Sequence, residues 1–482
     1  MNLPRMFAYA RSHHPRFVSE LKQFIRFPSV SSQAHRQSDI RLCAHWLAKN
    51  LQQVGLERVR VIPTQGNPIV YASWLRAPGR PTLILYGHYD VLPGEPLKEW
   101  RTPPFMPTIQ NDNLYGRGAA DDKGQLFAHV KALESHLQAS GSLPVNVKCI
   151  FEGEEEVGSP NLRSFVVRNR RTLRANAAVI SDTRMLGPDR PAISYAQRGG
   201  LRAEVEVTGP PNELHSGAFG GGVHNPILAL CDILAGLHDS DGRVTIPGFY
   251  DDVRVWNEKE RDFMARSGPS DREILRAARV AHGWGESGYS LYERTTIRPD
   301  LGVNGISGGH TGPGVKGVIP KSALAKISFR LVPDQDPTRI AKIFREHIAR
   351  LTPATVQSRV RTMSHVHPAL VNRNHPAVQA AVIAYKKVFG ATPAFVRSGG
   401  SIPVVNTFQE ILGIPAVLMG FGLPDDHIHA PNEKFNLQIF YKAIETSIWY
   451  LALASNLLRP ARGSYKKVEK YDHRLPLSCR TR

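Results

Sequence analysis

The chain has 482 residues, 41% of them hydrophobic and 21% charged, a composition typical of a globular protein long enough for two domains. No apolar run approaches the roughly 18 residues that a membrane-spanning helix needs. The N-terminal region has no apolar segment of the kind found in a secretory signal. The four cysteines show no paired spacing, which argues against a disulfide framework or a cysteine-based zinc site. We therefore expect a cytoplasmic protein that does not insert into a membrane.

The basic charge is spread unevenly along the chain. The formal net charge is +19, and residues 459–482 contribute +6 of it through eight Lys or Arg and two acids. The remaining basic residues are scattered and lack the interleaved aromatic residues of many nucleic-acid-binding surfaces. We interpret the charge as a basic solvated surface, not a nucleic-acid-binding one, and residues 459–482 as a flexible basic tail.

The first 197 residues contain predicted helices that alternate with short apolar strands. Helical spacing of apolar residues predicts helices at 36–54 and 123–139. Continuous apolar runs predict buried strands at 81–86, 145–151 and 177–180. Such alternation is typical of an α/β layer with a parallel or mixed sheet.

The pattern changes near residue 198. Residues 201–208 and 356–362 alternate between apolar and polar positions, as strands of a half-exposed sheet do. Between them the sequence predicts a helix at 226–237, a strand at 323–331 and a helix at 336–351, and it predicts no element in the long polar stretch from about 242 to 313. We interpret residues 198–367 as an α+β domain of their own.

From residue 377 the first pattern returns. Helices are predicted at 377–389 and 437–458, with an apolar strand at 416–419. The predicted fold class is therefore α/β, with a mixed, mostly parallel sheet flanked by helices and interrupted by an inserted domain. The main domain comprises residues 1–197 plus 368–458, and the inserted one residues 198–367.

Two groups of chemically active residues follow the predicted strand at 81–86. His88 comes two positions before Asp90, so on an extended segment both side chains face the same side, and Asp90 can orient a metal-binding His88. For this pair taken alone, a buried structural histidine is the commoner explanation. Asp121 precedes the helix at 123–139 and could cap it. A second carboxylate at Asp122 argues against a phosphate loop, and a bridging metal ligand explains Asp121 better.

Acidic residues also follow the next two predicted strands. Glu154, Glu155 and Glu156 come after the strand at 145–151, where adjacent carboxylates repel one another unless cations lie nearby. Glu156 can then be a metal ligand, and Glu155 a base that takes a proton from an activated water. Asp182 follows the strand at 177–180, at the edge where open α/β sheets place their sites.

The last candidate ligand is either His427 or His429, and the residue types alone do not choose between them. Two histidines with three or four carboxylates and a spare glutamate are the inventory of a bridged di-zinc site with its own general base. Mn²⁺ or Co²⁺ would accept the same nitrogen and oxygen ligands.

Taken in order, these motifs resemble the di-zinc peptidase family that includes carnosinase, cytosolic nonspecific dipeptidase, carboxypeptidase G and succinyl-diaminopimelate desuccinylase. The resemblance runs from about residue 15 to 455 and is greatest to the carnosinase-like dipeptidases. The matching stretches are His88-Tyr-Asp90, Tyr115-Gly-Arg-Gly118, Asp121-Asp-Lys-Gly124, Glu155-Glu156-Val-Gly-Ser159, His215-Ser-Gly217, Phe329-Arg330, Gly399-Gly-Ser-Ile-Pro403, and His429 with Asn432-Glu433-Lys434.

The resemblance implies a role for each matching residue at the metal centre. One zinc ion would be held by His88 and Asp182, and the other by Glu156 and His429. Asp121 would bridge the two ions, Asp90 would orient His88, and Glu155 would be the general base and then the proton donor to the leaving amine.

The resemblance also implies how substrate is held. The inserted domain would be a lid and dimerisation domain, and its His215 would reach the partner subunit's active site to stabilise the oxyanion. Arg330 would grip the substrate carboxylate. Gly399, Gly400 and Ser401 would bind near the same carboxylate.

We therefore expect a homodimeric enzyme with two zinc ions per subunit that hydrolyses the amide bond of dipeptides or small peptides. An N-acyl amino acid deacylase or desuccinylase would use the same site. A non-catalytic metal-binding or nucleic-acid-binding protein is a third hypothesis, against which the complete set of ligands argues. Asp182, where some relatives have Glu, favours a dipeptidase or aminopeptidase. Ser398 stands where carnosinase-like relatives usually have Glu, which leaves the substrate contacts at that position open.

Overall fold

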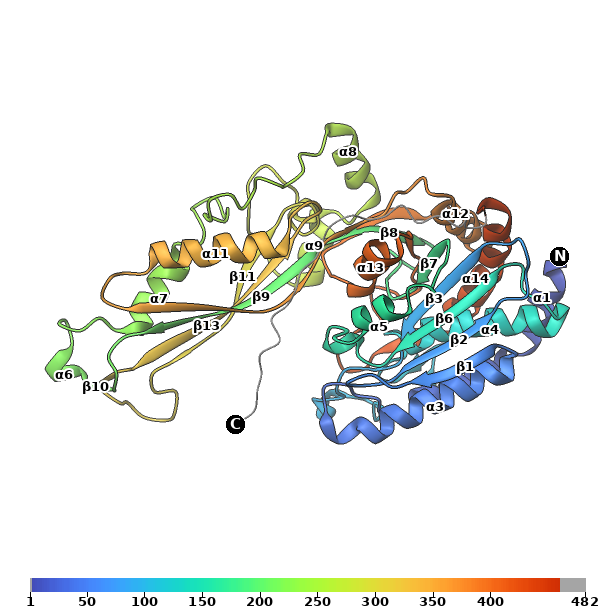
Figure 1. Ribbon diagram of the computed structural model, residues 1–482, viewed down its shortest axis with the longest axis horizontal. Coiled ribbons are helices and arrows are strands. Elements are labelled where there is room, and N and C mark those ends of the chain that lie inside the picture. The colour runs from blue at the N-terminus through green and yellow to red at the C-terminus, as the bar shows by residue number, and fades with distance from the viewer. Residues whose placement is uncertain (1, 460–482) are drawn as a thin grey trace.

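The computed structural model describes residues 2–459, which form two lobes joined by extended strands (Figure 1). The first lobe is built on a nine-stranded mixed sheet, counted over the described residues. Along the sheet the strands are β1 (Glu57–Ile62), β2 (Ile69–Trp74), β6 (Asn146–Glu152), β3 (Thr82–His88), β7 (Ala177–Ile180), β17 (Ala416–Leu418), β8 (Ala192–Gln197) and β15 (Ala369–Leu370), with β16 (Ala394–Ser398) also paired to β8. Strands β6, β3, β7 and β17 run parallel to one another, whereas β1 and β2 pair antiparallel.

Helices cover both faces of this sheet. Along β3, Leu83 and Leu85 belong to one hydrophobic core, and Ile84 and Tyr86 to the other. This explains why β3 is a continuous apolar run, since both faces of the strand are buried. One face is covered by α1 (Leu3–Ser12), α2 (His14–Ile25), α3 (Gln37–Val54), α4 (Lys123–Ser140), α12 (Pro376–Phe389) and α14 (Leu437–Leu457), and the other by α5 (Leu162–Asn169) and α13 (Pro403–Thr407) with the π-turn Phe408–Leu412.

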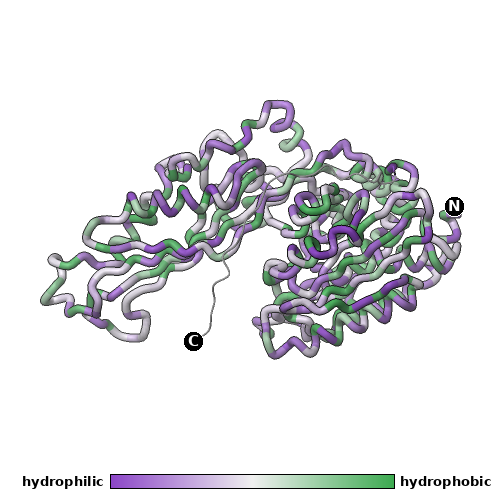
Figure 2. Tube along the Cα trace, in the orientation of Figure 1, coloured by the Kyte–Doolittle hydropathy of each residue, from purple (hydrophilic) through white to green (hydrophobic). Residues whose placement is uncertain are grey.

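The outer helices show the amphipathic pattern that the sequence predicts. In Figure 2, α3 alternates between hydrophilic and hydrophobic turns along the lower edge of the first lobe. Its buried side chains include Ile40, Cys43, Leu47 and Leu51, which recur at helical spacing. The helix ends at Gly55, whose left-handed backbone conformation stops it.

The second lobe is a four-stranded antiparallel sheet with helices on one face. Its strand order is β11 (Asp300–Gly308), β13 (Ser322–Leu331), β9 (Gly199–Thr208) and β14 (Gln357–Val366). Alternate residues of β9, from Leu201 to Val207, are buried in a core shared with α7 (Pro226–Ala235) and α11 (Pro337–Leu351). At the far end of this lobe lies a small two-stranded antiparallel sheet of β10 (Leu214–His215) and β12 (Val318–Ile319), next to α6 (Ser216–Phe219) (Figure 1).

The predicted fold class is confirmed, and so is nearly every predicted helix and strand within a few residues. The polar stretch at 242–313 proves to be structured, because it contains α8 (Glu258–Ser267), α9 (Asp271–Ala278), α10 (Leu291–Arg294) and β11. Ser270 and Ser290 each begin a helix through a capping box, with Glu273 and Glu293 as the reciprocal acids. This local signal could have revealed α9 and α10. The domain limits at 198 and 367 stay a prediction.

Three further observations concern membrane-spanning helices, cysteine thiols and the C-terminal tail. Among the described residues, no helix is both long and apolar enough to cross a bilayer. Cys43, Cys149 and Cys231 are free thiols, the first two buried. Apart from Arg459, the basic tail predicted at 459–482 lies outside the described residues.

Candidate metal centre

The parallel strands bring three acidic or histidine-bearing segments to one edge of the first sheet. β3 pairs with β6 so that His88 lies opposite Glu152, and with β7 so that Tyr86 lies opposite Ile180. Residues that directly follow these strands therefore share an edge, as in other open α/β sheets. His88, the segment after Glu152, and Asp182 meet there.

Five predicted ligands form two groups that share Asp121. In each group the candidate ligand atoms lie within 4.8 Å of one another. The first group joins His88 Nε2 to Asp121 Oδ1 at 3.1 Å and to Asp182 Oδ2 at 3.9 Å. The second joins His429 Nε2 to Asp121 Oδ2 at 2.8 Å and to Glu156 Oε2 at 3.4 Å. Each oxygen of Asp121 thus faces a different histidine, which is the arrangement that a bridging carboxylate requires.

The carboxylates of this centre are crowded and shielded from water. Burial and the nearby Asp121 raise the pKa of Glu156 to about 10, and the same causes raise the pKa of Asp182 well above its ordinary value. Burial opposes ionisation of Asp121 as well, but hydrogen bonds from His429 and His88 hold its pKa below the usual range. Acids packed this closely favour a cation between them. The donor set of two imidazoles and three carboxylates fits two divalent metal ions.

Asp90 connects His88 to the segment that carries Glu155. The His88 Nδ1 atom lies 3.0 Å from the Asp90 backbone carbonyl and 3.5 Å from its carboxylate, so the nearer orienting group is the carbonyl. The two carboxylate oxygens of Asp90 accept the backbone N–H groups of Glu155 and Glu156, each at 3.1 Å. Asp90 therefore connects His88 to the backbone of Glu155 and Glu156, and the spacing of these residues in the sequence does not reveal this connection.

Glu155 lies beside the two ligand groups without belonging to either of them among the described residues. Burial raises the pKa of its carboxyl to about 7, although the nearby His88 opposes the shift. A carboxyl with such a pKa can accept a proton and return it near neutral pH, which is the property of a general base that later acts as an acid.

Asp122 contacts His88 and does not cap α4. Its Oδ2 accepts the His88 backbone N–H at 3.3 Å, and no side-chain capping bond is present at this helix start. Burial raises the pKa of Asp122 well above its ordinary value. Asp122 therefore helps to position the backbone of His88.

Glu433 is a structural residue of the centre to which the sequence assigns no role. It is fully buried and accepts hydrogen bonds from the backbone N–H groups of Gly118, Ala120 and Asp121 at 2.9–3.1 Å, and from Arg117 Nη1 at 2.9 Å. Strand pairing supports this contact, because β5 (Asn113–Tyr115) lies antiparallel to β18 (Lys434–Asn436). The loop that ends in Asp121 is therefore held by the loop that carries His429.

The His429 loop has a constrained backbone. His427, His429 and Asn432 all adopt left-handed φ values, which non-glycine residues seldom do. The Asn432 amide fixes the loop by donating to the Glu99 carbonyl at 2.8 Å and accepting the Arg101 N–H at 2.7 Å. This conformation brings His429 to Asp121 and Glu156, whereas His427 belongs to neither ligand group in the described part of the chain.

Comparisons with known proteins decide the family. The model of the peptidase family M20/M25/M40 matches residues 84–452. This chain belongs to that peptidase family. The Cys-Gly metallodipeptidase dug1 of Schizosaccharomyces pombe is 30% identical over 470 residues, which cover 94% of this chain and 98% of the relative. The Beta-Ala-His dipeptidase of Homo sapiens is 32% identical over 452 residues, which cover 90% of this chain and 89% of the relative.

Solved structures agree with the sequence comparison. The crystal structure of human carnosine dipeptidase 1 superposes with a TM-score of 0.83 at 30% identity, covering 95% of this M20 chain and 99% of that one. An M20 family metallo-carboxypeptidase from Sulfolobus solfataricus gives a TM-score of 0.82 at 34% identity, covering 92% and 99%. The predicted resemblance to carnosinase-like members of the family is thereby confirmed.

The predicted substrate-binding residues lie where the two lobes of this M20 peptidase join. Ser401 Oγ donates to the Arg198 carbonyl, and the Arg198 guanidinium donates to the Gly399 carbonyl at 3.3 Å. Gly400 N–H donates to Ser398 Oγ at 3.1 Å. Arg330, exposed on β13, is close enough to Arg198 to help burial lower the pKa of that buried guanidinium to about 10. Arg198 is thus a second residue whose part in the site the sequence does not predict.

His215 lies away from all of these residues within one chain. It is exposed on β10, at the end of the second lobe farthest from the first (Figure 1). The remaining predicted site residues come from the first lobe or from the junction of the lobes.

Proposed function

We propose that this M20 peptidase hydrolyses the amide bond of dipeptides or small peptides with the help of two divalent metal ions. The observation that carries the proposal is the pair of ligand groups that share Asp121, with Glu155 next to both. The names of the related Cys-Gly and Beta-Ala-His dipeptidases support dipeptides as the substrate class.

Five residues would hold the metal ions. His88 and Asp182 would hold one, Glu156 and His429 the other, and Asp121 would bridge them. Two zinc ions per subunit fit these imidazole and carboxylate donors, and Mn²⁺ or Co²⁺ could replace them. When bound, the ions supply Lewis-acid activation of a water molecule and of the substrate carbonyl.

The protein's own groups would carry the proton and hold the substrate. Glu155 takes a proton from the attacking water and delivers it to the departing amine nitrogen, so that the carboxyl returns to its starting state. Arg330 presents a guanidinium to the substrate carboxylate, and the backbone of Gly399 and Gly400 lies at the same junction. Closure of the second lobe over the first would exclude water from the reacting groups.

The place of His215 supports a homodimer. The imidazole is exposed at the far end of the second lobe, so it reaches a metal centre only if that centre belongs to a second copy. We propose that His215 of one subunit stabilises the oxyanion in the other subunit. The dimer would then be required for turnover.

A deacylase acting on N-acyl amino acids would use the same metal centre, and the dipeptidase names of the relatives do not favour it. The deciding experiment is turnover by metal-loaded protein on free dipeptides and on N-acetyl and N-succinyl amino acids. Dipeptide cleavage that is lost in Glu155→Ala, with the bound metal retained, would establish the proposal. Cleavage of acylated substrates alone would make the protein a deacylase, and wild-type rates in Glu155→Ala would remove Glu155 from its role.

A further inference from the structure

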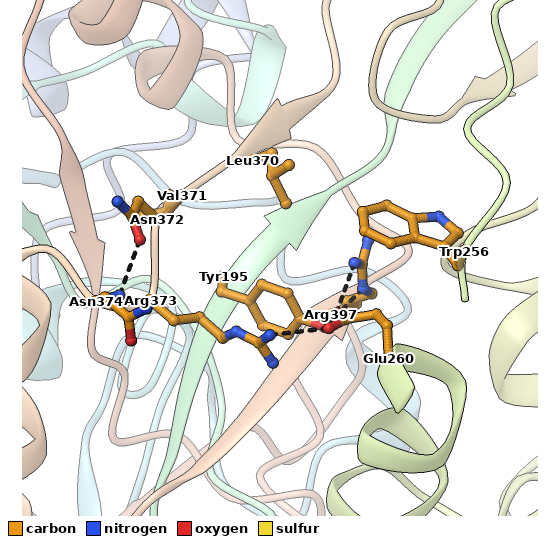
Figure 3. Close-up of a pocket in the computed structure, with 9 residues that line it drawn as sticks. All are labelled: Tyr195, Trp256, Glu260, Leu370, Val371, Asn372, Arg373, Asn374 and Arg397. Atoms are coloured by element: carbon orange, nitrogen blue, oxygen red, sulfur yellow. Dashed lines mark hydrogen bonds and ion pairs between the residues drawn. The ribbon is translucent and has the colours of Figure 1, made fainter. Parts of the chain in front are cut away.

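Apart from the metal centre, a pocket lies where α8 of the second lobe meets the sheet of the first lobe. It has a volume of about 370 Å³ and is lined by α8 and its approach on one side, and by β8, β16 and the segment after β15 on the other (Figure 3). None of its lining residues belongs to the metal centre. Trp256 and Glu260 come from the second lobe, and Tyr195, Arg373 and Arg397 from the first.

Two arginines in this pocket share one carboxylate. Arg397 Nη2 donates to Glu260 Oε1 at 3.0 Å, and Arg373 Nη2 donates to Glu260 Oε2 at 2.8 Å. The Arg397 side chain is 0% exposed and that of Arg373 30%. The cluster therefore keeps one positive charge more than its carboxylate neutralises.

Each of these guanidinium groups also has an unused donor. Within residues 2–459, the Nη1 atoms of Arg373 and Arg397 are buried and have no hydrogen-bond partner. A buried N–H without an acceptor is unfavourable, and more so when the group is charged. Both donors belong to side chains that line the same pocket.

Aromatic rings hold the two guanidinium groups in place. The Arg397 Cζ atom lies 4.0 Å from the centre of the Trp256 ring and 4.7 Å from that of Tyr195. The Arg373 Cζ atom lies 4.8 Å from the Tyr195 ring and 4.2 Å from the Phe263 ring. Figure 3 shows both guanidinium groups directed toward Glu260 from either side of Tyr195. Groups held this way lose little entropy when they bind a ligand.

We propose that this pocket binds a small organic carboxylate of about amino-acid size. The volume lies within the range of small-ligand sites. Arginine guanidinium groups favour a carboxylate over a neutral ligand. Leu370 and Val371 offer an apolar wall to the rest of the ligand.

The test is a titration of metal-loaded protein with acetate, succinate and alanine, with inorganic phosphate and chloride added at equal ionic strength for comparison. Tryptophan fluorescence is the readout, because Trp256 stacks on Arg397. Trp256→Phe identifies which part of the signal comes from the pocket, and calorimetry checks that this variant still binds. The proposal predicts saturable binding of at least one carboxylate, and not of chloride.

Three variants decide where the carboxylate binds. Arg373→Gln changes a residue at the half-buried rim of the pocket. Its affinity for the carboxylate should fall at least about tenfold, because one of the two guanidinium groups of the pocket is lost. Arg361→Gln is the matched control, since Arg361 is an exposed arginine paired with Glu204 on the second lobe. Arg330→Gln should keep the binding, which separates this pocket from the proposed substrate clamp.

Three results would overturn the inference. They are a fluorescence change that follows ionic strength alone, equal affinity in Arg373→Gln and wild type, and binding of phosphate without any carboxylate. Dipeptide turnover is measured separately, so failure of this proposal leaves the proposed function untouched.

Discussion

At the scale of single residues, this metal centre is a set of carboxyl groups whose ionisation the protein opposes. Burial raises the pKa of Glu156 to about 10 and that of Glu155 to about 7. Such groups are wholly or partly protonated at neutral pH until a cation arrives. Their function therefore depends on exchanging protons for metal, and this exchange can be measured.

We predict that metal binding at pH 7 releases at least one proton per subunit. The sign follows from the raised pKa values, because Glu156, with a pKa of about 10, holds a proton at pH 7 and must lose it to become a ligand, and burial raises the pKa of Asp182 in the same direction. The apparent affinity for Zn²⁺ should accordingly fall as the pH is lowered. Calorimetry of Zn²⁺ binding in buffers of different ionisation enthalpy measures the protons released, and Glu156→Gln should release fewer. Identical heats in all buffers would contradict the prediction.

At the scale of elements, the site depends on contacts between loops that are far apart in sequence. The Glu433 carboxylate fixes the backbone from Gly118 to Asp121, and Arg117 is its buried partner at 2.9 Å. A buried charge that loses its partner is strongly destabilising. The ligand geometry of Asp121 thus rests on a residue that binds no metal.

We predict that Glu433→Ala lowers the free energy of unfolding by about 3–5 kcal/mol, because Arg117 and three backbone N–H groups lose their acceptor. The variant should also bind fewer than two metal ions per subunit. Urea denaturation and metal analysis measure the two effects. Glu410→Ala, which removes an exposed partner of Arg163, is the control and should cost less than about 1 kcal/mol. A Glu433→Ala variant with full stability and full metal content would refute this account.

Helix α4 carries two buried neutral histidines, His129 and His136, whose surroundings the local sequence does not reveal. His129 Nε2 lies 2.6 Å from Ser181 Oγ, and its Nδ1 lies 3.0 Å from Ser447 Oγ. Ser181 donates in turn to the Met419 carbonyl at 2.6 Å and directly precedes Asp182. When His129 is neutral and its Nε2 carries the hydrogen, every donor in this series of hydrogen bonds has an acceptor. Burial lowers the pKa of both His129 and His136 to about 4.

We predict that these two histidines make the protein sensitive to acid. Their folded pKa values lie below the ordinary 6.5, so their contribution to stability is complete above pH 6.5 and is lost as the pH falls through 4. Each contributes at most about 3 kcal/mol. Denaturation of wild type and His129→Gln between pH 4 and 8 tests this, because the variant should show a weaker pH dependence. His45→Gln, at an exposed position of α3, should leave it unchanged.

How much of the fold and of the candidate site the sequence predicts depends on whether the residues that determine a feature are close together in the sequence. Strands β3, β6 and β7 are buried on both faces, so they appear as apolar runs and are correctly predicted. β11 contains three glycines and exposes much of its length, so it carries no such pattern. His88, Glu156 and Asp182 follow predicted strands and could be proposed from that position, whereas the choice of His429 over His427 needs the family resemblance. The roles of Glu433 and Arg198 depend on partners far away in the chain, and no spacing rule brings those partners together.

At the scale of the whole molecule, the two lobes carry different residues of the proposed site. The first lobe carries the metal centre and the second carries His215 at its far end, with the substrate-binding candidates at the junction (Figure 1). One chain therefore offers an exposed imidazole and a metal centre that lie far apart. Two copies related by a two-fold axis would place each imidazole at the other copy's centre.

We predict that two inactive variants, His215→Ala and Glu155→Ala, restore activity when they are mixed and allowed to exchange subunits. In a mixed dimer, the metal centre of the His215→Ala subunit keeps its own Glu155 and receives His215 from the partner, so one centre of the two is intact. Random exchange makes half of the dimers mixed, and activity should recover to about a quarter of the wild-type value. The measurement is dipeptide turnover against mixing ratio, with the maximum at equal amounts. If His215 acts within its own chain, every centre in the mixture lacks one of the two residues. Activity would then stay at the level of the single variants at every ratio.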